Sequence, residues 1–462
     1  MRLTLILILS LLFANQMYAQ TSPSPEGYWE GSIQLPGQAL GIEVELISDG
    51  EWSGTISIPL QGAVDLALTN IQVAADSVAF DLQAGAAFIS FRGRMVSDDL
   101  IEGTFLQAGM QFPFSLERSE KSEIIYQSPF ETEEIVIEAG DLKIAGTLQL
   151  AEQDSAQPIV IMISGSGAQD RDETILGFKP FRILADSMAS VGFASFRYDD
   201  RGIGGSNGNT DATLNELSDD LLHVIRFLKE DERIDSNRVF LLGHSQGGIL
   251  AGIATYSEEI AGVILMATPV LPGFEIINQQ IKEISRRSGI SGQIIEQNLQ
   301  LQNQIYEAIR RDEGLDEVRE IFEGRIRQQL AFISEEQIEA MGGAEAIINA
   351  QVEQQLAPMQ SRWFRSFMDY DPAEDLKYLE IPVLALFGEK DVQVLPSPNI
   401  NEINSWKTEN LAQNFHIQTI SKANHLFQES VTGMPQEYAT LEKVFAYGFI
   451  RTVNNWLLEE SK

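Results

Sequence analysis

A short motif in the second half of the chain carries the residues best suited to covalent chemistry. Gly243-His244-Ser245-Gln246-Gly247 follows an apolar run, Arg238 to Leu242, and precedes a helix-like stretch. Between a strand and a helix, a G-x-S-x-G sequence predicts a tight turn that projects the serine hydroxyl above a sheet. The two glycines lack a Cβ, so strand and helix can approach each other there. Ser245 is therefore the predicted nucleophile, and the alternative is a glycine-rich turn with an incidental serine.

A serine hydroxyl needs a neighbouring base, and the base needs an acid that orients it. The chain has four histidines, which are His223, His244, His416 and His425. We expect His223 within a helix, His244 inside the turn and pointing away from the serine hydroxyl, and His416 at the start of the last strand. His425 follows that strand in a loop, where a base must lie to reach the serine. It is the predicted base.

The orienting acid is expected on another loop at the same end of the sheet. A strand over Pro382 to Phe387 leads to Asp391, which is the predicted acid. The chain order serine, aspartate, histidine matches one of the known arrangements of such a triad. The alternative acids are Glu389, Asp371 and Asp375.

A tetrahedral intermediate needs N–H donors fixed where negative charge develops. The backbone N–H of Gln246, next to the nucleophile, is one predicted donor. The second is expected from the glycine-rich loop after the apolar strand Ile159 to Ile163, and we assign it to the Ser166 N–H. The alternatives to Ser166 are the N–H groups of Gly165 and Gly167.

Each of three further groups of residues has two alternative roles. Charges of both signs alternate over residues 169–173 and 197–202, and we expect salt bridges that brace loops at the rim of the site. A direct contact with substrate is the alternative for these clusters. The aromatic residues Trp363, Phe364 and Phe367 either line an acyl pocket or pack a helical lid onto the body of the protein.

The whole chain is long and acidic. It has 462 residues, 44% of them hydrophobic, and 32 Lys+Arg against 67 Asp+Glu give a net charge of −35. Such a surface repels nucleic acid and anionic membranes, so no nucleic-acid partner is expected. The absence of cysteine excludes disulfides, cysteine metal sites and a cysteine nucleophile. The predicted chemistry needs neither a metal nor an organic cofactor, and it leaves the oligomeric state open.

The N-terminus has the pattern of a secretory signal peptide over residues 1–19. Met1-Arg2 is a short positive region, Leu3 to Phe13 is apolar, and cleavage is expected after Ala19. A secreted or periplasmic protein without a membrane span after cleavage is predicted, and an uncleaved anchor is the alternative. Residues 21–120 then alternate apolar and polar positions, as in Ile42 to Leu46, between glycine-rich and aspartate-rich turns. They predict a small antiparallel barrel or sandwich.

Residues 129–462 form the predicted catalytic domain. After a β-hairpin, continuous apolar strands such as Gly262 to Met266 alternate with helices such as Leu214 to Lys229. This predicts an α/β fold with a mostly parallel sheet flanked by helices. Between about residues 271 and 375 the alternation gives way to helical periodicity, which predicts a helical lid; a decoration or dimerisation arm is the alternative. The domain is expected to close with a helix over Glu437 to Leu458.

Across residues 133–458 the chain resembles the α/β-hydrolase superfamily, and more narrowly bacterial serine esterases similar to the dienelactone-hydrolase-like branch. The matching segments are SGSGAQDRDE (164–173), RYDDRG (197–202), GHSQGG (243–248), GEKD (388–391) and NHLF (424–427). The resemblance implies hydrolysis of carboxylic esters with short acyl chains by Ser245, Asp391 and His425. Dienelactone hydrolases use a cysteine nucleophile, which this chain lacks, and Ala168 stands where a proline is expected.

Two other functions stay open from the sequence. Serine peptidases of the prolyl-oligopeptidase type also place a β domain before the hydrolase domain, although their propellers need more than the roughly ninety residues available here. A binding protein on a hydrolase scaffold that has lost its activity would use the β domain instead. The presence of all three triad candidates argues against this second alternative.

Overall fold

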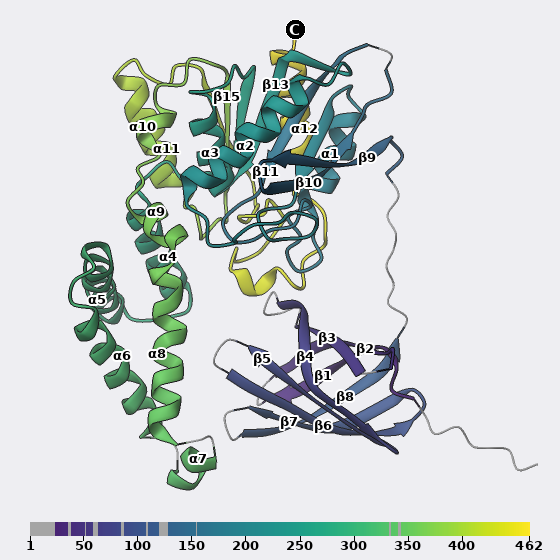
Figure 1. Ribbon diagram of the computed structural model, residues 1–462. Helices are drawn as coiled ribbons and strands as arrows, with labels where there is room; N and C mark the ends of the chain where they lie inside the picture. The colour runs from purple at the N-terminus through teal and green to yellow at the C-terminus, as the bar shows by residue number, and fades with distance from the viewer. Residues whose placement is uncertain are drawn as a thin grey trace, which may run out of the picture. The chain divides into compact units, whose positions relative to one another are not determined.

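A computed structural model shows how the chain is arranged (Figure 1). The structure describes residues 24–35, 38–50, 52–58, 63–84, 87–107, 110–119, 128–153, 155–331, 334–340 and 343–462. The predicted signal peptide, residues 1–19, lies outside these ranges. The chain divides into two compact units, one N-terminal and one C-terminal.

The N-terminal unit is a closed antiparallel barrel of eight strands. The strands are β1 (Gly27–Leu35), β2 (Gln38–Ser48), β3 (Trp52–Ile58), β4 (Ala63–Ala74), β5 (Ser77–Ala84), β6 (Ala87–Ser97), β7 (Leu100–Gln107) and β8 (Met110–Ser119). Each strand pairs with the next along the chain, and β1 pairs with β8 to close the sheet. Of the two all-β forms that the sequence allowed, the structure has the barrel.

Aromatic side chains fill the described interior of this barrel. Trp29, Phe80 and Phe91 are fully buried, and the ring of Phe91 lies 4.8 Å from that of Phe80 and 5.2 Å from that of Phe105. An eight-stranded barrel is just wide enough for inward-facing side chains to fill it. The alternation of apolar and polar residues along the strands therefore builds a packed core.

The C-terminal unit is built on an eight-stranded sheet in the order β16-β15-β14-β13-β11-β12-β10-β9. Its strands are β9 (Thr132–Ala139), β10 (Leu142–Gln149), β11 (Gln157–Ile163), β12 (Ala194–Tyr198), β13 (Ile234–His244), β14 (Gly262–Met266), β15 (Val383–Gly388) and β16 (Phe415–Ile420). Strand β10 runs antiparallel to both of its neighbours, β9 and β12. The strands from β11 to β16 run parallel to one another. This topology confirms the predicted fold class.

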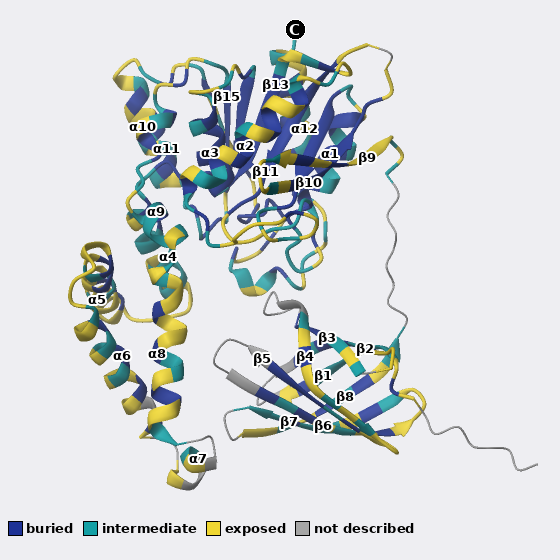
Figure 2. Ribbon diagram, in the orientation of Figure 1, coloured by how far each residue is buried: buried dark blue, intermediate teal, exposed yellow. Residues whose placement is uncertain are grey.

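Helices cover both faces of the sheet because its central strands are apolar on both sides. Ile159 and Ile161 of β11 belong to one core with helices α2 (Leu214–Lys229), α3 (Gln246–Ala254) and α11 (Pro396–Thr408). Val160 and Met162 belong to the opposite core with α1 (Pro180–Ala189) and α12 (Phe449–Glu460). Figure 2 shows the central strands buried between these helices.

A helical insert separates β14 from β15, as the sequence predicted. It comprises α4 (Gly273–Arg287), α5 (Gly292–Arg311), α6 (Leu315–Leu330), α7 (Glu335–Ala340), α8 (Ala344–Gln360), α9 (Arg362–Met368) and α10 (Ala373–Leu376). Helices α5, α6 and α8 share a small apolar core that includes Ile309, Phe322 and Val352. No helix among the described residues is long and apolar enough to cross a membrane.

The predicted closing helix is wrong in its first half. Helix α12 begins at Phe449, and before it only Pro435–Glu437 forms a short 3₁₀ turn. Gly448, with φ 89°, adopts a left-handed conformation that stops a helix from extending backwards through it. The ammonium group of Lys443 instead binds the backbone oxygens of this loop at Tyr438 and Ala439.

Candidate active site

Ser245 occupies a strained turn between β13 and α3. Its φ of 51° and ψ of −118° lie outside the usual regions for a residue with a side chain. Two hydrogen bonds hold the turn: the Ser245 N–H donates to Met266 O at 2.8 Å, and the Gly248 N–H donates to Ser245 O at 3.1 Å. A Cβ on Gly243 would lie 2.2 Å from the carbonyl carbon of Gly247, so the crossing has no room for a side chain.

The structure brings His425 and Asp391 together. His425, in the loop after β16, places Nδ1 2.8 Å from Oδ2 of Asp391, which follows β15. The other carboxylate oxygen accepts the N–H groups of Gln393 and Val394 at 2.8 and 2.9 Å. Both side chains are buried. The carboxylate accepts a hydrogen bond from the Nδ1–H group. In the neutral ring the proton therefore lies on Nδ1, and Nε2 is unprotonated, as a general base requires.

The alternative acids have other partners. Glu389 is exposed, and its carboxylate accepts from the Ser421 hydroxyl and the Lys422 N–H at 2.9 and 2.7 Å. Asp371 and Asp375 make local contacts, to the Ala373 N–H and the Tyr370 hydroxyl respectively. Asp391 is the carboxylate that lies against His425.

The other histidines lie in different surroundings. His223 and His416 are exposed, on α2 and β16. His244 is buried in the turn, where its Nδ1 lies 2.7 Å from Oε1 of Glu173. The sequence analysis placed Glu173 only in a charged cluster, and nothing local in the sequence indicates this pairing.

The glycine-rich loop after β11 lies against Ser245, the predicted nucleophile. A Cβ on Gly165 would lie 3.5 Å from the Cβ of Ser245. The Gly165 N–H donates to Glu173 Oε1 at 2.7 Å, so it is already engaged and is removed from the candidate oxyanion donors. Ser166 and Gly167 are exposed in this loop, and their N–H groups remain candidates for the second oxyanion donor. Gln246, at the first position of α3, has a backbone N–H without an acceptor within the helix.

A family model described as serine aminopeptidase, S33, matches residues 179–426, more than half of the chain. The chain belongs to this α/β-hydrolase family. The matched range contains Ser245, Asp391 and His425, and the match confirms the superfamily that the sequence motifs indicated.

Individual relatives are distant. Esterase EstD of Thermotoga maritima is 26% identical over 316 residues, which make up 68% of this chain and 64% of EstD. The chain thus spans less than two thirds of that esterase. Among solved structures, the α/β hydrolase GrgF from Penicillium sp. sh18 gives a TM-score of 0.42 at 15% identity, covering 71% of this chain and 97% of GrgF. The Pyrococcus furiosus esterase Pf2001 gives a TM-score of 0.41 at 13% identity, covering 72% and 90%.

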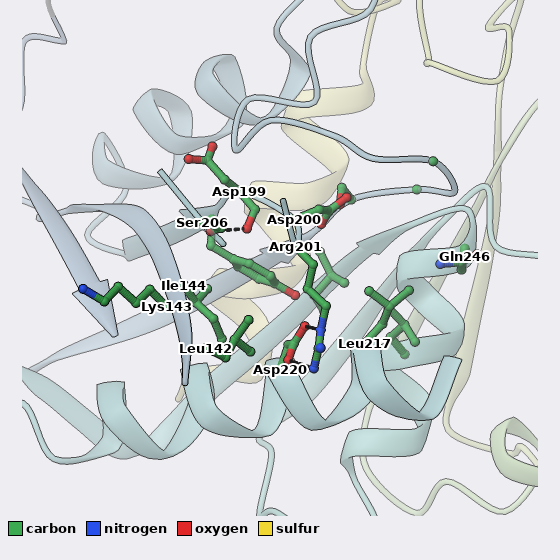
Figure 3. Close-up of a pocket in the computed structure, with 16 residues that line it drawn as sticks. Leu142, Lys143, Ile144, Asp199, Asp200, Arg201, Ser206, Leu217, Asp220 and Gln246 are labelled. Atoms are coloured by element: carbon green, nitrogen blue, oxygen red, sulfur yellow. Dashed lines mark hydrogen bonds and ion pairs between the residues drawn. The ribbon is translucent and has the colours of Figure 1, made fainter. Parts of the chain in front are cut away.

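A cleft beside the turn is lined by residues from several segments of the C-terminal unit. Gly167 of the glycine-rich loop, Gln246 of α3 and Trp363 of α9 line it together with Asp200. A smaller pocket adjoins it, where Figure 3 shows Asp200 and Gln246 with Leu217 of α2. The helical insert therefore forms part of the cleft next to the nucleophile turn.

Asp200 braces the glycine-rich loop from the end of β12. Its two carboxylate oxygens accept from the Ser164 hydroxyl at 2.8 Å and from the Gln169 N–H at 2.9 Å. Burial raises the pKa of Asp200 to about 7, against the lowering effect of these two hydrogen bonds. Asp200 thus titrates near neutral pH and contacts the glycine-rich loop that holds the candidate oxyanion donor Ser166.

Ion pairs brace the rim, as the alternating charges predicted. The guanidinium of Arg171 binds both oxygens of Asp199, at 3.0 and 2.7 Å. Arg197 pairs with Asp172. A further ion pair joins the loop after β12 to α2, between Arg201 and Asp220. These side chains are engaged with one another, which supports bracing as their role.

Proposed function

We propose that this hydrolase is a serine esterase that cleaves carboxylic esters through an acyl-enzyme. The observation that carries the proposal is the buried His425–Asp391 pair, on loops at the sheet edge where the strained turn presents Ser245. The esterase among its relatives supports the same reaction class. The closed barrel gives no support to a propeller-bearing peptidase. Its aromatic-filled interior offers equally little support for a binding protein that uses the β domain.

The proposed reaction has two halves. In the first, His425 Nε2 takes the Ser245 proton as the oxygen attacks the ester carbonyl, and it then returns that proton to the departing alcohol. In the second, water gives its proton to the same nitrogen, attacks the acyl carbon, and releases the acid and the free serine. Asp391 keeps the imidazole oriented throughout. The N–H groups of Gln246 and Ser166 hold the negative oxygen of both tetrahedral intermediates.

Short acyl chains are the expected substrates, as the resemblance to bacterial serine esterases implies, and Trp363 lines the cleft beside Gln246. Hydrolysis of p-nitrophenyl esters from acetate to laurate measures this preference directly. In Ser245→Ala we expect kcat to fall by roughly 10⁶-fold, as in other enzymes that lose the nucleophile of a triad. Ser405→Ala is the matched control, since this serine lies on the exposed face of α11.

The family description favours a second candidate, an aminopeptidase. A panel of amino-acid p-nitroanilides separates the two functions on the same protein samples. Ester turnover that disappears in Ser245→Ala, with anilide turnover at least 100-fold lower, supports the esterase. Faster anilide turnover that depends on Ser245 would establish the aminopeptidase, and residual ester turnover within tenfold of wild type in Ser245→Ala would refute the nucleophile.

We also propose that the protein is exported, on the pattern of residues 1–19. We expect the protein in the periplasmic fraction or the medium after cell fractionation. Its intact mass should correspond to a mature chain that begins at Gln20. Leu7→Arg places a charge in the apolar stretch and should keep the protein in the cytoplasm at its full mass. A mature exported protein that retains Met1 would indicate the uncleaved anchor instead.

A further inference from the structure

A buried ion pair behind the nucleophile turn connects three loops of the site. Oε1 of Glu173 lies 2.7 Å from Nδ1 of His244 and also accepts the Gly165 N–H at 2.7 Å. Nε2 of His244 lies 3.1 Å from the backbone oxygen of His425. A continuous chain of contacts thus runs from the glycine-rich loop, through the residue before Ser245, to the loop of the proposed base.

The partners of His244 determine its charge. A carboxylate oxygen and a carbonyl oxygen can only accept, so both ring nitrogens donate only when the ring is an imidazolium. The side chains of His244 and Glu173 are 3% and 1% exposed, and a lone charge at such a position would be costly. Together they form a buried ion pair whose carboxylate also fixes a backbone amide.

Other charges around His244 act in the same direction. Burial lowers the pKa of His244, but the charge and hydrogen bond of Glu173, the backbone oxygen of His425 and the charge of Asp391 raise it above its ordinary value. The His425 ring, which is also titratable, lies 4.7 Å away. The surroundings of His244 therefore favour its imidazolium form next to the proposed base.

The pair is in close contact with the groups that it connects. A Cβ on Gly165 would lie 3.0 Å from Oε1 of Glu173, 3.3 Å from Nδ1 of His244 and 3.5 Å from the Cβ of Ser245. With its own N–H bound to Glu173, Gly165 has its backbone direction fixed at this point. The direction of the next N–H in the loop, that of Ser166, depends on it.

We propose that Glu173 and His244 are positioning residues for the esterase reaction. Their ion pair sets the glycine-rich loop against Ser245, so that the Ser166 N–H meets the developing oxyanion, and it holds the backbone of His425. Both residues act through neighbouring backbone groups and not through contact with the substrate. This inference rests on the proposed function, and it extends that function to residues outside the triad.

The test begins with Glu173→Gln, which keeps an oxygen for the Gly165 N–H but removes the charge. We expect kcat for p-nitrophenyl acetate to fall about 10- to 100-fold with KM within about threefold of wild type, because misplaced groups cost transition-state stabilisation. A boronic acid that forms a tetrahedral adduct with Ser245 should lose affinity by the same factor as kcat/KM.

The pH profile gives a second readout, which a purely structural role would not change. Without the carboxylate of Glu173, burial lowers the pKa of His244, and the ring gives up one of its two protons as the pH rises. The kcat of Glu173→Gln should therefore decrease, relative to wild type, as the pH rises from about 5 to about 6.5, because its His244 loses the proton below the ordinary histidine pKa. His244→Asn, which retains one N–H donor toward Glu173, should lower kcat in the same way but without this pH-dependent decrease.

Glu258→Gln is the matched control. Its carboxylate also has two partners, Arg226 at 2.7 Å and Lys229 at 3.0 Å, and its side chain is only 14% exposed. We expect its kinetics to match those of wild type. Thermal denaturation of each variant shows whether it is folded.

Several results would overturn the proposal. Glu173→Gln with wild-type kcat and boronate affinity would show that the pair does not position the site. An increase in KM at unchanged kcat would make Glu173 a substrate-binding residue, and loss of the folded state would make the pair a structural ion pair. Failure of the esterase function itself is recognised separately, as absent Ser245-dependent ester turnover in wild type. The rate of Ser245 labelling by a fluorophosphonate then tests the pair without any ester.

Discussion

The indole N–H of Trp363 donates to the side-chain oxygen of Gln246 at 2.6 Å and joins helix α9 of the insert to the residue after Ser245. The Trp363 ring stacks on Phe367 of the same helix, with the centroids 5.5 Å apart. Gln246 is also the residue whose backbone N–H is the proposed oxyanion donor. The insert therefore does more than border the cleft, because it contacts a residue that is proposed to act in the reaction.

Trp363→Phe tests this contact. Phenylalanine can keep the stacking on Phe367 but removes the N–H donor and leaves the Gln246 oxygen unpaired. A hydrogen bond of this kind contributes about 1 kcal/mol, so we expect kcat/KM for p-nitrophenyl butyrate to fall roughly 3- to 10-fold. Steady-state kinetics over the same ester series would also show whether longer chains gain access.

The chain offers a matched control in Trp406→Phe. The Trp406 indole also donates to a side chain, Glu402 at 2.9 Å, and it is buried in α11. This variant should lose stability but keep its kinetic constants. If both variants lost activity equally, the effect would come from general destabilisation, and the role of the insert contact would be rejected.

Asp391→Asn tests whether Asp391, and not the nearby Glu389, is the carboxylate that orients His425. The amide can present an N–H to Nδ1 and stabilise the wrong tautomer, so we expect kcat to fall about 10⁴-fold with an unchanged fold. Glu389→Gln changes an exposed carboxylate two residues away and should leave kcat within about twofold of wild type. A large loss in Glu389→Gln with an active Asp391→Asn would reverse the assignment of the acid.

Local sequence patterns predicted those parts of the fold that depend on local periodicity. Strand β14 and helix α2 have the predicted bounds, because an uninterrupted apolar run and an uninterrupted helical face each determine one element. The choice between barrel and sandwich needed pairings between distant residues, such as Tyr28 with Ser119. Alternation has the same period in both architectures, so it could not decide between them.

Local sequence patterns likewise indicated some residues of the candidate site and missed others. The turn at Ser245 has a local signature, and strand-end loops indicated His425 and Asp391. Glu173 and His244 are 71 residues apart, and their contact exists only after the sheet has formed. Each belongs to a motif that suggested another explanation, so no local pattern indicated that they form a pair.

The nucleophile turn should tolerate no side chain at its crossing. In Gly243→Ala the new Cβ would lie 2.2 Å from backbone atoms of Gly247 and Gly248, which cannot move without displacing α3. We expect severe destabilisation, seen as a large decrease in Tm or in soluble yield. Gly324→Ala in α6 meets nothing within 4 Å and should be neutral or stabilising by up to about 1 kcal/mol. Similar Tm values for the two variants would show that the crossing is looser than the structure indicates.

Asp200→Asn should change how stability depends on pH. The pKa of Asp200 is raised by burial to about 7 in the folded protein, whereas the ordinary value of an aspartate is near 4. The folded state therefore binds the extra proton between these values, and its stability falls as the pH rises toward 7. Asparagine does not titrate, so the Tm of the variant minus that of wild type should increase by about 2–4 °C between pH 5.5 and pH 8.

Asp235→Asn is the control for this prediction. Arg238 holds the pKa of Asp235 below its ordinary value, so its titration ends below pH 5.5 and its Tm difference should stay constant. A constant difference for Asp200→Asn as well would mean that Asp200 is already ionised in the folded protein at pH 5.5.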